Sequence, residues 1–322
     1  MAQRAPDITI PETVTPNELV RARSSWELFW ARFVRDRAAV GGMVFIIVLV
    51  NLAIFAPLIA RIVGHSPNQL FGSMLTPLGL PKGPNAHFWF GADQAGRDVF
   101  VRTLYGARTS LAVSVVGTGA ATVLGTITGS VAGYYGGWVD TAISRFIDII
   151  LSLPLLLFAI GLSSVCSVST RGCLGGVLKP GLSLVMAIIA VFTWPYMARI
   201  VRGQVIALKQ RDFAEAARAL GASDRRIMFI ELLPNLVAPI VVYATLTLPT
   251  NILFEASLSY LGVGVPQSTP SWGRMLSDAT SGSLFTYAWW MMLYPGLFLL
   301  LATLAFNLVG DGLRDALLPE SR

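Results

Sequence analysis

The 322-residue sequence contains few of the side chains that carry enzyme chemistry. Charged residues make up only 13% of it, and it has two histidines, two cysteines and three lysines. No lysine follows a glycine or precedes a serine or threonine, so a GxxxxGK[ST] loop for ATP cannot occur. The motifs HExxH and GxSxG are also missing. These absences argue against a hydrolase, a metalloenzyme or an ATPase, and we expect no catalytic, metal or cofactor site in this chain.

Hydrophobic residues, by contrast, make up 54% of the sequence, and its mean hydropathy is +0.64. Crossing a hydrocarbon layer of ~30 Å takes a helix of about 18 residues or more. Apolar runs of this length cover residues 40–63, 111–131, 147–165, 182–199, 236–254 and 285–308. Each is expected to be a helix because lipid offers backbone groups no hydrogen-bond partner. The sequence therefore predicts an all-α integral membrane protein with six transmembrane helices and both termini on one side.

The distribution of basic residues predicts the orientation. Of the 24 lysines and arginines, 16 lie in the amino-terminal 39 residues, the 133–146 and 199–235 loops and the carboxyl tail. The other eight lie on the opposite face. By the positive-inside rule the face with more basic residues, which carries both termini, is cytoplasmic. The net charge of +6 is explained in this way without a nucleic-acid partner.

The runs divide the chain into five parts. Residues 1–39 form a cytoplasmic tail, 40–63 the first transmembrane helix and 64–110 an extracytoplasmic loop that contains the segment GADQAGRD. Residues 111–309 form a five-helix core that includes the loop 211–234, and 310–322 form a cytoplasmic tail.

The amino-terminal tail contains a predicted amphipathic helix. Ser24 and Glu27 have the spacing of a capping box. The aromatic residues at helical spacing are Trp26, Phe29, Trp30 and Phe33. This helix is expected either to lie on the inner membrane surface or to pack against the rest of the protein, and the periodicity fits both equally well.

Four further side chains are candidates for specific roles. Cys166 and Cys173 lie in a predicted outer loop, where an oxidising exterior favours a disulfide over two free thiols. Asp148 and Glu255 lie near the ends of predicted spans, close enough to the membrane interfaces to be solvated. For Glu255 we consider a position on the translocation path, against a structural hydrogen bond to a loop.

Glycine and proline predict irregular or closely packed spans. Proline occurs in five of the six runs and tends to kink a helix, as expected at Pro154 in the third run. The second run has instead the spacing Gly125-x-x-x-Gly129, which lets a neighbouring helix approach closely.

The segment RDFAEAARALGASDRRIMFIELLPN, residues 211–235, predicts two short helices in the cytoplasmic loop. An apolar stripe along the first helix consists of Phe213, Ala216, Ala217 and Leu220. Gly221 is expected to end this helix, Ser223 to cap the next one, and Pro234 to make a break before the fifth span. Periodicity alone supports either a docking surface for a partner or a loop that packs on itself.

The same segment resembles the EAA motif, E-A-A-x3-G-x9-I-x-L-P, of the membrane subunits of bacterial ABC importers. The match comprises Glu215, Ala216, Ala217, Gly221, Leu233 and Pro234 at the required spacing. Glu231 stands where the general pattern has isoleucine.

Three other stretches resemble the C-type permease subunit of dipeptide, oligopeptide and nickel importers. They are residues 90–111, where Ala92 replaces the usual threonine, 254–273 and 310–319. The resemblance covers nearly the whole chain.

This resemblance implies a type I ABC importer (MetI-like) permease fold whose EAA coupling helices dock on an ATPase. The implied partners are a homologous second permease in a heterodimer, two cytoplasmic ATPase subunits that carry ATP and Mg, and an external solute-binding protein. The implied location is the bacterial inner membrane, and the implied cargo is di- or oligopeptides, with nickel chelates or other small solutes as alternatives. The main competing hypothesis is an ion-coupled secondary transporter or channel, which would need internal repeats around a charged site at the membrane midplane.

Overall fold

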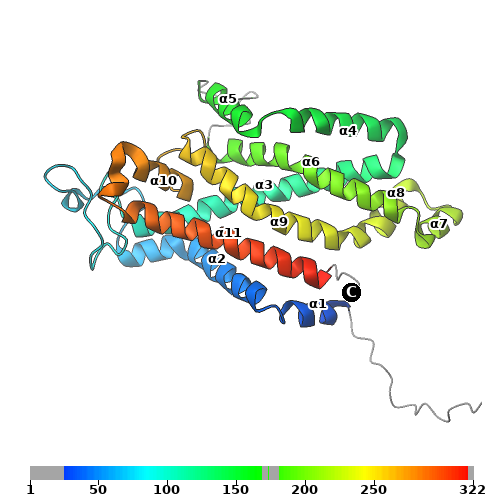
Figure 1. Cartoon of the computed structure of the whole chain (residues 1–322), viewed down its shortest axis with the longest axis horizontal. Coiled ribbons are helices and arrows are strands. Elements are labelled where there is room, and N and C mark those ends of the chain that lie inside the picture. The colour runs from blue at the N-terminus through cyan, green and yellow to red at the C-terminus, as the bar shows by residue number, and fades with distance from the viewer. Residues whose placement is uncertain (1–24, 169–172, 174–180, 318–322) are drawn as a thin grey trace, which may run out of the picture.

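The computed structural model describes residues 25–168, 173 and 181–317, and this part of the chain is almost entirely helical (Figure 1). The long helices are α2 (Arg37–Val63), α3 (Val99–Tyr135), α6 (Leu182–Leu208), α9 (Leu233–Tyr260) and α11 (Trp290–Leu317). The shorter helices are α1 (Ser25–Phe33), α4 (Gly137–Ser152), α5 (Leu155–Val168), α7 (Asp212–Ala219), α8 (Asp224–Arg226) and α10 (Trp272–Thr280). Short helical turns are η1 (Gly72–Met74), the π-helical η3 (Ile227–Leu232) and η4 (Ser281–Thr286).

Five continuous helical segments in the described part are long and apolar enough to cross a membrane, and a bent pair brings the number to as many as six. The bent pair is α4 and α5, whose axes differ by 80°. The run 147–165 is therefore two helices rather than one, and the kink expected at Pro154 is a break between them. Leu153 has an extended backbone, with φ of −78° and ψ of 129°, because the following Pro154 disfavours the helical conformation in the residue before it.

The second membrane helix, α3, begins 12 residues earlier than its apolar run. Asp98 caps it by accepting hydrogen bonds from the backbone N–H groups of Phe100 (2.8 Å) and Val101 (3.4 Å). The first part of α3 is not in the predicted apolar run because it contains polar residues such as Arg102. The segment between the first two spans is therefore shorter than the predicted 64–110.

Helices α3 and α6 are in close contact along a stripe of glycines in α3. A Cβ atom at Gly125 would lie 2.6 Å from the Cβ of Met197, and one at Gly129 would lie 2.5 Å from the carbonyl oxygen of Ala198. The Gly125-x-x-x-Gly129 prediction of close helix packing is confirmed, and Gly133 continues the stripe by one turn. The two helices consequently form one closely packed unit.

Pro234 does not interrupt the fifth span, contrary to the expectation. It lies at the junction of η3 and α9, and the helix runs without a break from Asp224 to Tyr260. The preceding turn, η3, is π-helical. Ser223 lies at the predicted N-cap position, but its side chain makes no capping hydrogen bond.

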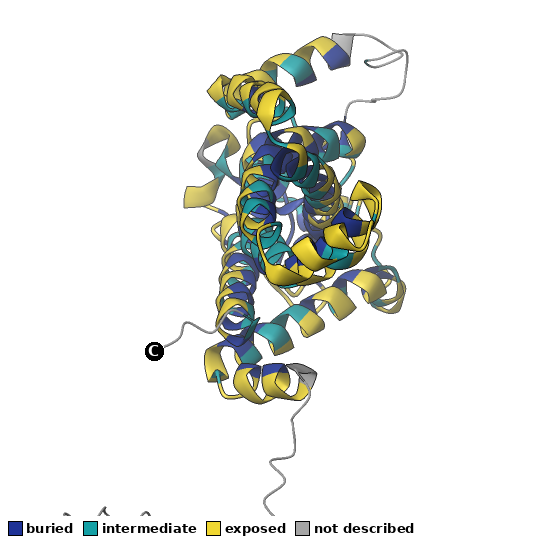
Figure 2. Cartoon of the chain, turned by 90° about the vertical axis from the view of Figure 1, so that its right-hand side faces the viewer, coloured by how far each residue is buried: buried dark blue, intermediate teal, exposed yellow. Residues whose placement is uncertain are grey.

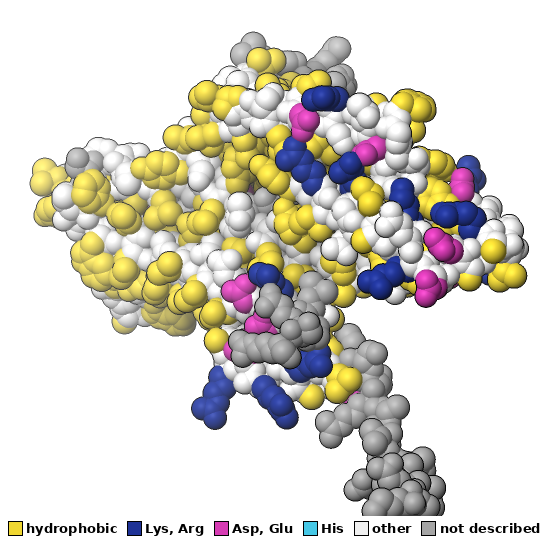
Figure 3. All heavy atoms as spheres, turned by 45° about the vertical axis from the view of Figure 1, so that its right-hand side comes forward, with side chains coloured by type: hydrophobic (Ala, Val, Ile, Leu, Met, Phe, Trp, Pro, Cys, Tyr) yellow, Lys and Arg dark blue, Asp and Glu magenta, His cyan; other side chains and the backbone are white. Residues whose placement is uncertain are grey.

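The two ends of the bundle differ. In Figure 1 the right-hand end carries α7, α8 and the nearby α1, and the left-hand end carries residues 64–98 and α10. Figure 2 shows buried residues between the helices and exposed residues on their outer faces. Charged side chains gather over α7, α8 and α1 in Figure 3, whereas the surface toward the other end is mainly uncharged. Such an arrangement suits a bundle whose middle is in contact with lipid.

Helix α1 packs against the end of α11. Phe29 and Phe33 are buried in a cluster with Val309 and Ala316, whereas Trp30 is exposed. Ser24 and the side chain of Trp26, for which the sequence predicted a cap and part of the aromatic face, lie outside the described residues.

Candidate functional site

Residues 211–234, which we call the elbow, form two short helical pieces joined by a tight turn. Gly221 makes this turn with a positive φ of 82°, a conformation that residues with a side chain rarely adopt. The N–H of Gly221 donates to the carbonyl of Arg218 (3.0 Å), and the N–H of Ala222 donates to that of Ala217 (3.0 Å). These bonds satisfy the last carbonyl groups of α7. The prediction that Gly221 ends the helix is confirmed.

Most of the apolar stripe of α7 faces away from the bundle, but Ala217 packs against the apolar cluster of α6, η3 and α9. Leu220 is 89% exposed and Phe213 is 39% exposed, whereas Ala214, which lies off the predicted stripe, is fully buried. Ala216 is exposed and Ala217 is half-buried. A loop that packed on itself would bury this stripe. An exposed apolar patch of this kind is typical of a surface that binds another protein.

The other residues of the EAA match lie on or beside this surface. Glu215 is exposed and makes no ion pair within the described part of the chain. Gly221 and Pro234 are exposed as well, and Leu233 is half-buried at the start of α9. Glu231, at the position that departs from the motif, is half-buried in η3.

The opposite side of the elbow is anchored in the bundle. Ile227 and Leu232 of η3 are almost fully buried in an apolar cluster with side chains of α6 and α9. The members from these two helices are Met197, Val201, Val205 and Leu236. The burial of these large side chains, worth about 1.5–3 kcal/mol each, holds the elbow firmly against the two helices.

Polar contacts join the elbow, and Lys209 just before it, to a third helix, α3. The Tyr134 hydroxyl donates to Oδ1 of Asp224 (2.7 Å), and Nζ of Lys209 donates to the carbonyls of Gly133 (2.8 Å) and Tyr134 (3.3 Å). Lys209 thus caps the carboxyl end of α3. Sequence reasoning missed these contacts because the partners lie 75 to 90 positions apart.

Two ion pairs connect α4 to α6 near the same end of the bundle. Arg202 pairs with Asp140 through both carboxylate oxygens, with 2.6 Å from Nη2 to Oδ2. Arg199 pairs with Asp148 at 2.6 Å, and both side chains are half-exposed. Asp148 is solvated, as expected.

Glu255 has no exposed surface, so the expectation that it would be solvated was wrong. Its Oε1 accepts a hydrogen bond from the hydroxyl of Ser259 (2.7 Å), which in turn accepts one from the N–H of Val265 (3.2 Å). The carboxyl group is thus linked to the loop that follows α9. Its role on a translocation path stays a prediction.

Cys166 and Cys173 are joined by a disulfide bond in the structure, and their Cα atoms are 4.9 Å apart. Cys166 ends the apolar part of α5 and is buried in the cluster formed by α3, α4, α5 and α6.

The segment GADQAGRD builds a buried ionic cluster at the other end of the molecule. Asp93 pairs with Arg97 (2.6 Å) and Arg102 (3.4 Å), and Asp278 of α10 pairs with Arg97 (3.5 Å) and Arg274 (3.4 Å). Burial raises the pKa of the Asp278 carboxyl, and the neighbouring arginines offset part of that increase. The cluster fixes α10 against the start of α3.

Comparison with known proteins agrees with this architecture. Residues 125–322 match the family model described as binding-protein-dependent transport system inner membrane component. Residues 24–77 match the N-terminal TM domain of oligopeptide transport permease C.

Individual relatives match along almost their whole length. The dipeptide permease DppC of Alkalihalophilus pseudofirmus is 38% identical, over 97% of this chain and 95% of that protein. The glutathione permease GsiD of Escherichia coli is 40% identical, over 93% of this chain and 92% of that protein. The oligopeptide permease OppC of Bacillus subtilis is 38% identical, over 94% of this chain and 92% of that protein.

The fold is also similar to a solved structure, that of the inward-facing MetNI methionine ABC transporter. The TM-score is 0.51 at 22% identity, and the match covers 68% of this chain and 96% of that one. The expected MetI-like architecture is thereby confirmed. The chain therefore belongs to the family of inner-membrane components of binding-protein-dependent transport systems, as a multi-pass permease of the C type.

Proposed function

We propose that this chain is the permease subunit of an ATP-driven importer for dipeptides or oligopeptides and forms half of its translocation pathway. The names of the relatives support the substrate class, since they are dipeptide, glutathione and oligopeptide permeases. A nickel-chelate or other small-solute importer is the alternative that the sequence resemblance leaves open.

The exposed apolar stripe of the elbow carries the coupling part of the proposal. Leu220 and Phe213 offer apolar area to an ATPase subunit, and the small Ala216 allows its backbone to approach closely. Ala217 packs this helix against the bundle. Glu215 is free to pair with a basic residue of that partner. Gly221, Leu233 and Pro234 hold this surface in place through the turn after α7 and the start of α9.

Movement of the docked ATPase would reach the membrane helices through the anchored side of the elbow. Reversing a two-state population from 1:99 to 99:1 requires about 5.5 kcal/mol, which a flexible linker could not transmit. The buried Ile227 and Leu232 connect the elbow to α6 and α9. The bond from Tyr134 to Asp224 adds α3 to this unit.

The proposed assembly contains this chain, a homologous second permease, two ATPase subunits and an external solute-binding protein. ATP and Mg belong to the ATPase subunits, and this chain needs no cofactor of its own. In this arrangement the elbow and both termini are cytoplasmic, and residues 64–98 and α10 face the outside. The excess of basic residues in the elbow and tails supports this orientation.

Glu215 offers a direct experiment on this coupling. Glu215→Lys places a like charge against the basic partner residue, so we expect a complex that assembles but hydrolyses ATP without importing peptide. Peptide uptake and ATPase activity are measured in proteoliposomes with the purified complex, and Glu215→Gln serves as the control of equal size. Normal uptake by Glu215→Lys would contradict the proposal.

The competing secondary transporter is tested by omitting the ATPase subunits. An importer of the proposed type takes up no peptide without them, whatever ion gradient is applied. Transport by the isolated chain would instead favour the secondary transporter.

A further inference from the structure

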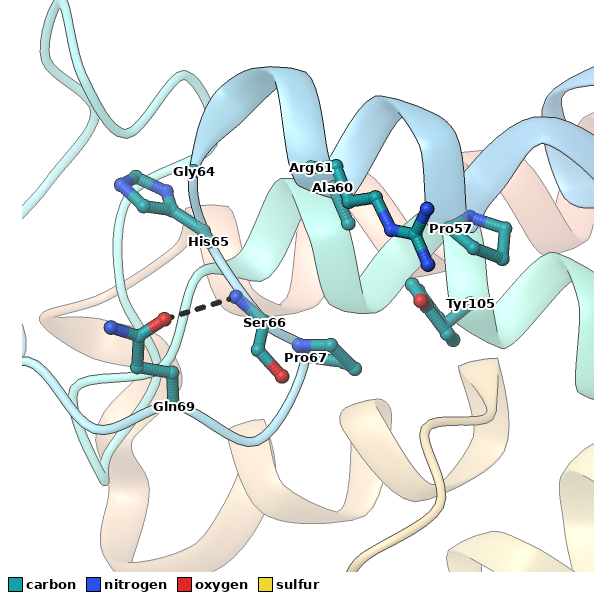
Figure 4. Close-up of a pocket in the computed structure, with 9 residues that line it drawn as sticks. All are labelled: Pro57, Ala60, Arg61, Gly64, His65, Ser66, Pro67, Gln69 and Tyr105. Carbon is teal, nitrogen blue, oxygen red and sulfur yellow. Dashed lines mark hydrogen bonds between the residues drawn. The ribbon is translucent and has the colours of Figure 1, made fainter.

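An open hollow of about 420 Å³ lies where α2 ends, beside the second turn of α3. It is formed by the last turns of α2, the residues that follow it and Tyr105 (Figure 4). The elbow lies at the other end of the bundle, so this hollow takes no part in the proposed contact with an ATPase (Figure 1).

Two polar groups on its wall have no partner. The guanidinium of Arg61 and the hydroxyl of Tyr105 make no hydrogen bond or ion pair with any residue that the structure describes. In Figure 4 both side chains project into the same space between α2 and α3, while the ring of His65 points away from it. Nδ1 of His65 instead contacts Oδ2 of Asp98 at 2.5 Å. A free positive charge and a free hydroxyl thus face one cavity.

We place the hollow at the depth of the lipid headgroups because it lies at the end of a membrane helix. Arg61 is in the last turn of α2, which ends at Val63 and is capped by Gly64 in a left-handed conformation. Basic side chains at the ends of membrane helices extend toward the headgroup region, and tyrosine is enriched at the same depth. Both groups are therefore placed to meet a phosphate at the membrane surface.

The helix below the hollow is apolar and uncovered. Ile54 and Leu58, which lie seven and three positions before Arg61 on the same face of α2, are 62% and 52% exposed. Lipid acyl chains fit this surface next to a headgroup held by Arg61. A soluble anion bound at Arg61 would itself make no contact with these two side chains.

We propose that this hollow binds an anionic phospholipid. The Arg61 guanidinium holds the headgroup phosphate with two parallel N–H donors, the Tyr105 hydroxyl donates a third hydrogen bond, and an acyl chain lies along Ile54 and Leu58. The bound lipid would join the end of α2 to α3. This site is independent of which solute the protein transports.

Lipid retention by the full chain tests the proposal. The protein is purified in detergent, supplied with mixed micelles of phosphatidylglycerol and phosphatidylcholine, and examined by native mass spectrometry. We expect wild type to retain one tightly held phosphatidylglycerol, and Arg61→Gln to bind it roughly tenfold more weakly because a charged hydrogen-bond pair is lost. Arg61→Lys should keep part of the affinity, since it keeps the charge.

Arg314→Gln is the matched control. Arg314 is also an exposed arginine in the last turn of a membrane helix, but it lies at the other end of the bundle. This variant should retain the lipid as wild type does. Equal retention by wild type and Arg61→Gln would overturn the proposal, and so would loss of the same lipid in Arg314→Gln.

A second pair of measurements separates the lipid from free phosphate. Leu58→Asn should weaken phosphatidylglycerol retention, and added inorganic phosphate should not displace the lipid from wild type. Displacement by inorganic phosphate, combined with full retention in Leu58→Asn, would assign the hollow to a soluble anion and contradict the proposed lipid site.

Discussion

Gly221 has a backbone conformation that other residues reach only with strain. Replacing it by alanine puts a Cβ atom into a left-handed conformation, which costs roughly 1–2 kcal/mol. The space around it is open, so this cost comes from the backbone rather than from a clash. We expect Gly221→Ala to lower the stability of the purified protein and to weaken coupling, as measured by thermal unfolding and by uptake per ATP.

Gly203 provides the control for this substitution. It lies within α6, has no atom within 4 Å of an added Cβ, and has no positive φ. Gly203→Ala should be neutral or stabilising by about 0.5–1 kcal/mol, because alanine favours the helix. Equal unfolding temperatures for the two variants would show that the turn at Gly221 is not strained.

Glu255 is a buried carboxyl with a hydrogen-bonding neighbour. We expect the fold to depend on the size of this side chain and on its acceptor oxygen. Glu255→Gln keeps an oxygen for the Ser259 hydroxyl, so we expect normal assembly and uptake. Glu255→Leu removes the acceptor of the Ser259 hydroxyl, which itself accepts from the N–H of Val265, so we expect reduced expression of the folded protein.

Both Glu255 variants are compared by their yield of folded protein and by peptide uptake in proteoliposomes. Normal assembly together with abolished uptake in Glu255→Gln would contradict the structural role. It would place the carboxyl on the translocation path instead.

Among the elements, α3 contacts the elbow through the ring of Tyr134, which packs against its apolar cluster, and through the hydroxyl of the same residue. Tyr134→Phe removes the hydroxyl that donates to Asp224 but keeps the ring. A hydrogen bond to a charged group contributes about 1.5–3 kcal/mol. We expect several-fold less peptide imported per ATP hydrolysed, with normal assembly of the complex.

The neighbouring Tyr135 is the matched control. Its side chain is exposed, and its hydroxyl makes no hydrogen bond within the described residues. Tyr135→Phe should therefore import as wild type does. If the two variants behave alike, α3 does not take part in coupling through Tyr134.

Because α3 and α6 are in close contact at Gly129, a larger residue there should lower the stability of the protein. A Cβ at Gly129 would lie 2.5 Å from the backbone oxygen of Ala198, so Gly129→Ala must push the helices apart. Overpacking of this kind costs roughly 1–3 kcal/mol. Gly119→Ala adds the same atom to the same helix with nothing within 4 Å and should leave the unfolding temperature unchanged. A Gly129→Ala protein as stable as wild type would contradict this packing.

At the scale of the whole molecule, apolar runs were sufficient to predict most of the bundle. Runs longer than the membrane thickness have no alternative to helix, so α2, α6 and α11 appear near their expected positions. The beginning of α3 could not be predicted in this way. Arg102 looked like a loop residue because its partner Asp93 and its neighbour Asp278 are known only from the folded structure.

The candidate site was predicted in part. Helical periodicity identified the stripe of α7, and glycine identified its turn, because both are local properties of the sequence. Which way the stripe faces depends on packing against α6 and α9, and periodicity could not decide it. Pro154 indicated a kink between α4 and α5, but proline alone does not fix the size of a kink, so the angle of 80° could not be predicted.

Cross-linking of the elbow in the assembled importer provides the most direct measurement. A photoreactive amino acid replaces Leu220, which is 89% exposed on the elbow, or Leu78, which is 86% exposed in the segment 64–98 at the other end. Illumination of the intact complex should link position 220, and not position 78, to an ATPase subunit. An ATPase cross-link from position 78, or none from position 220 in a complex that hydrolyses ATP and imports peptide, would contradict the proposed coupling.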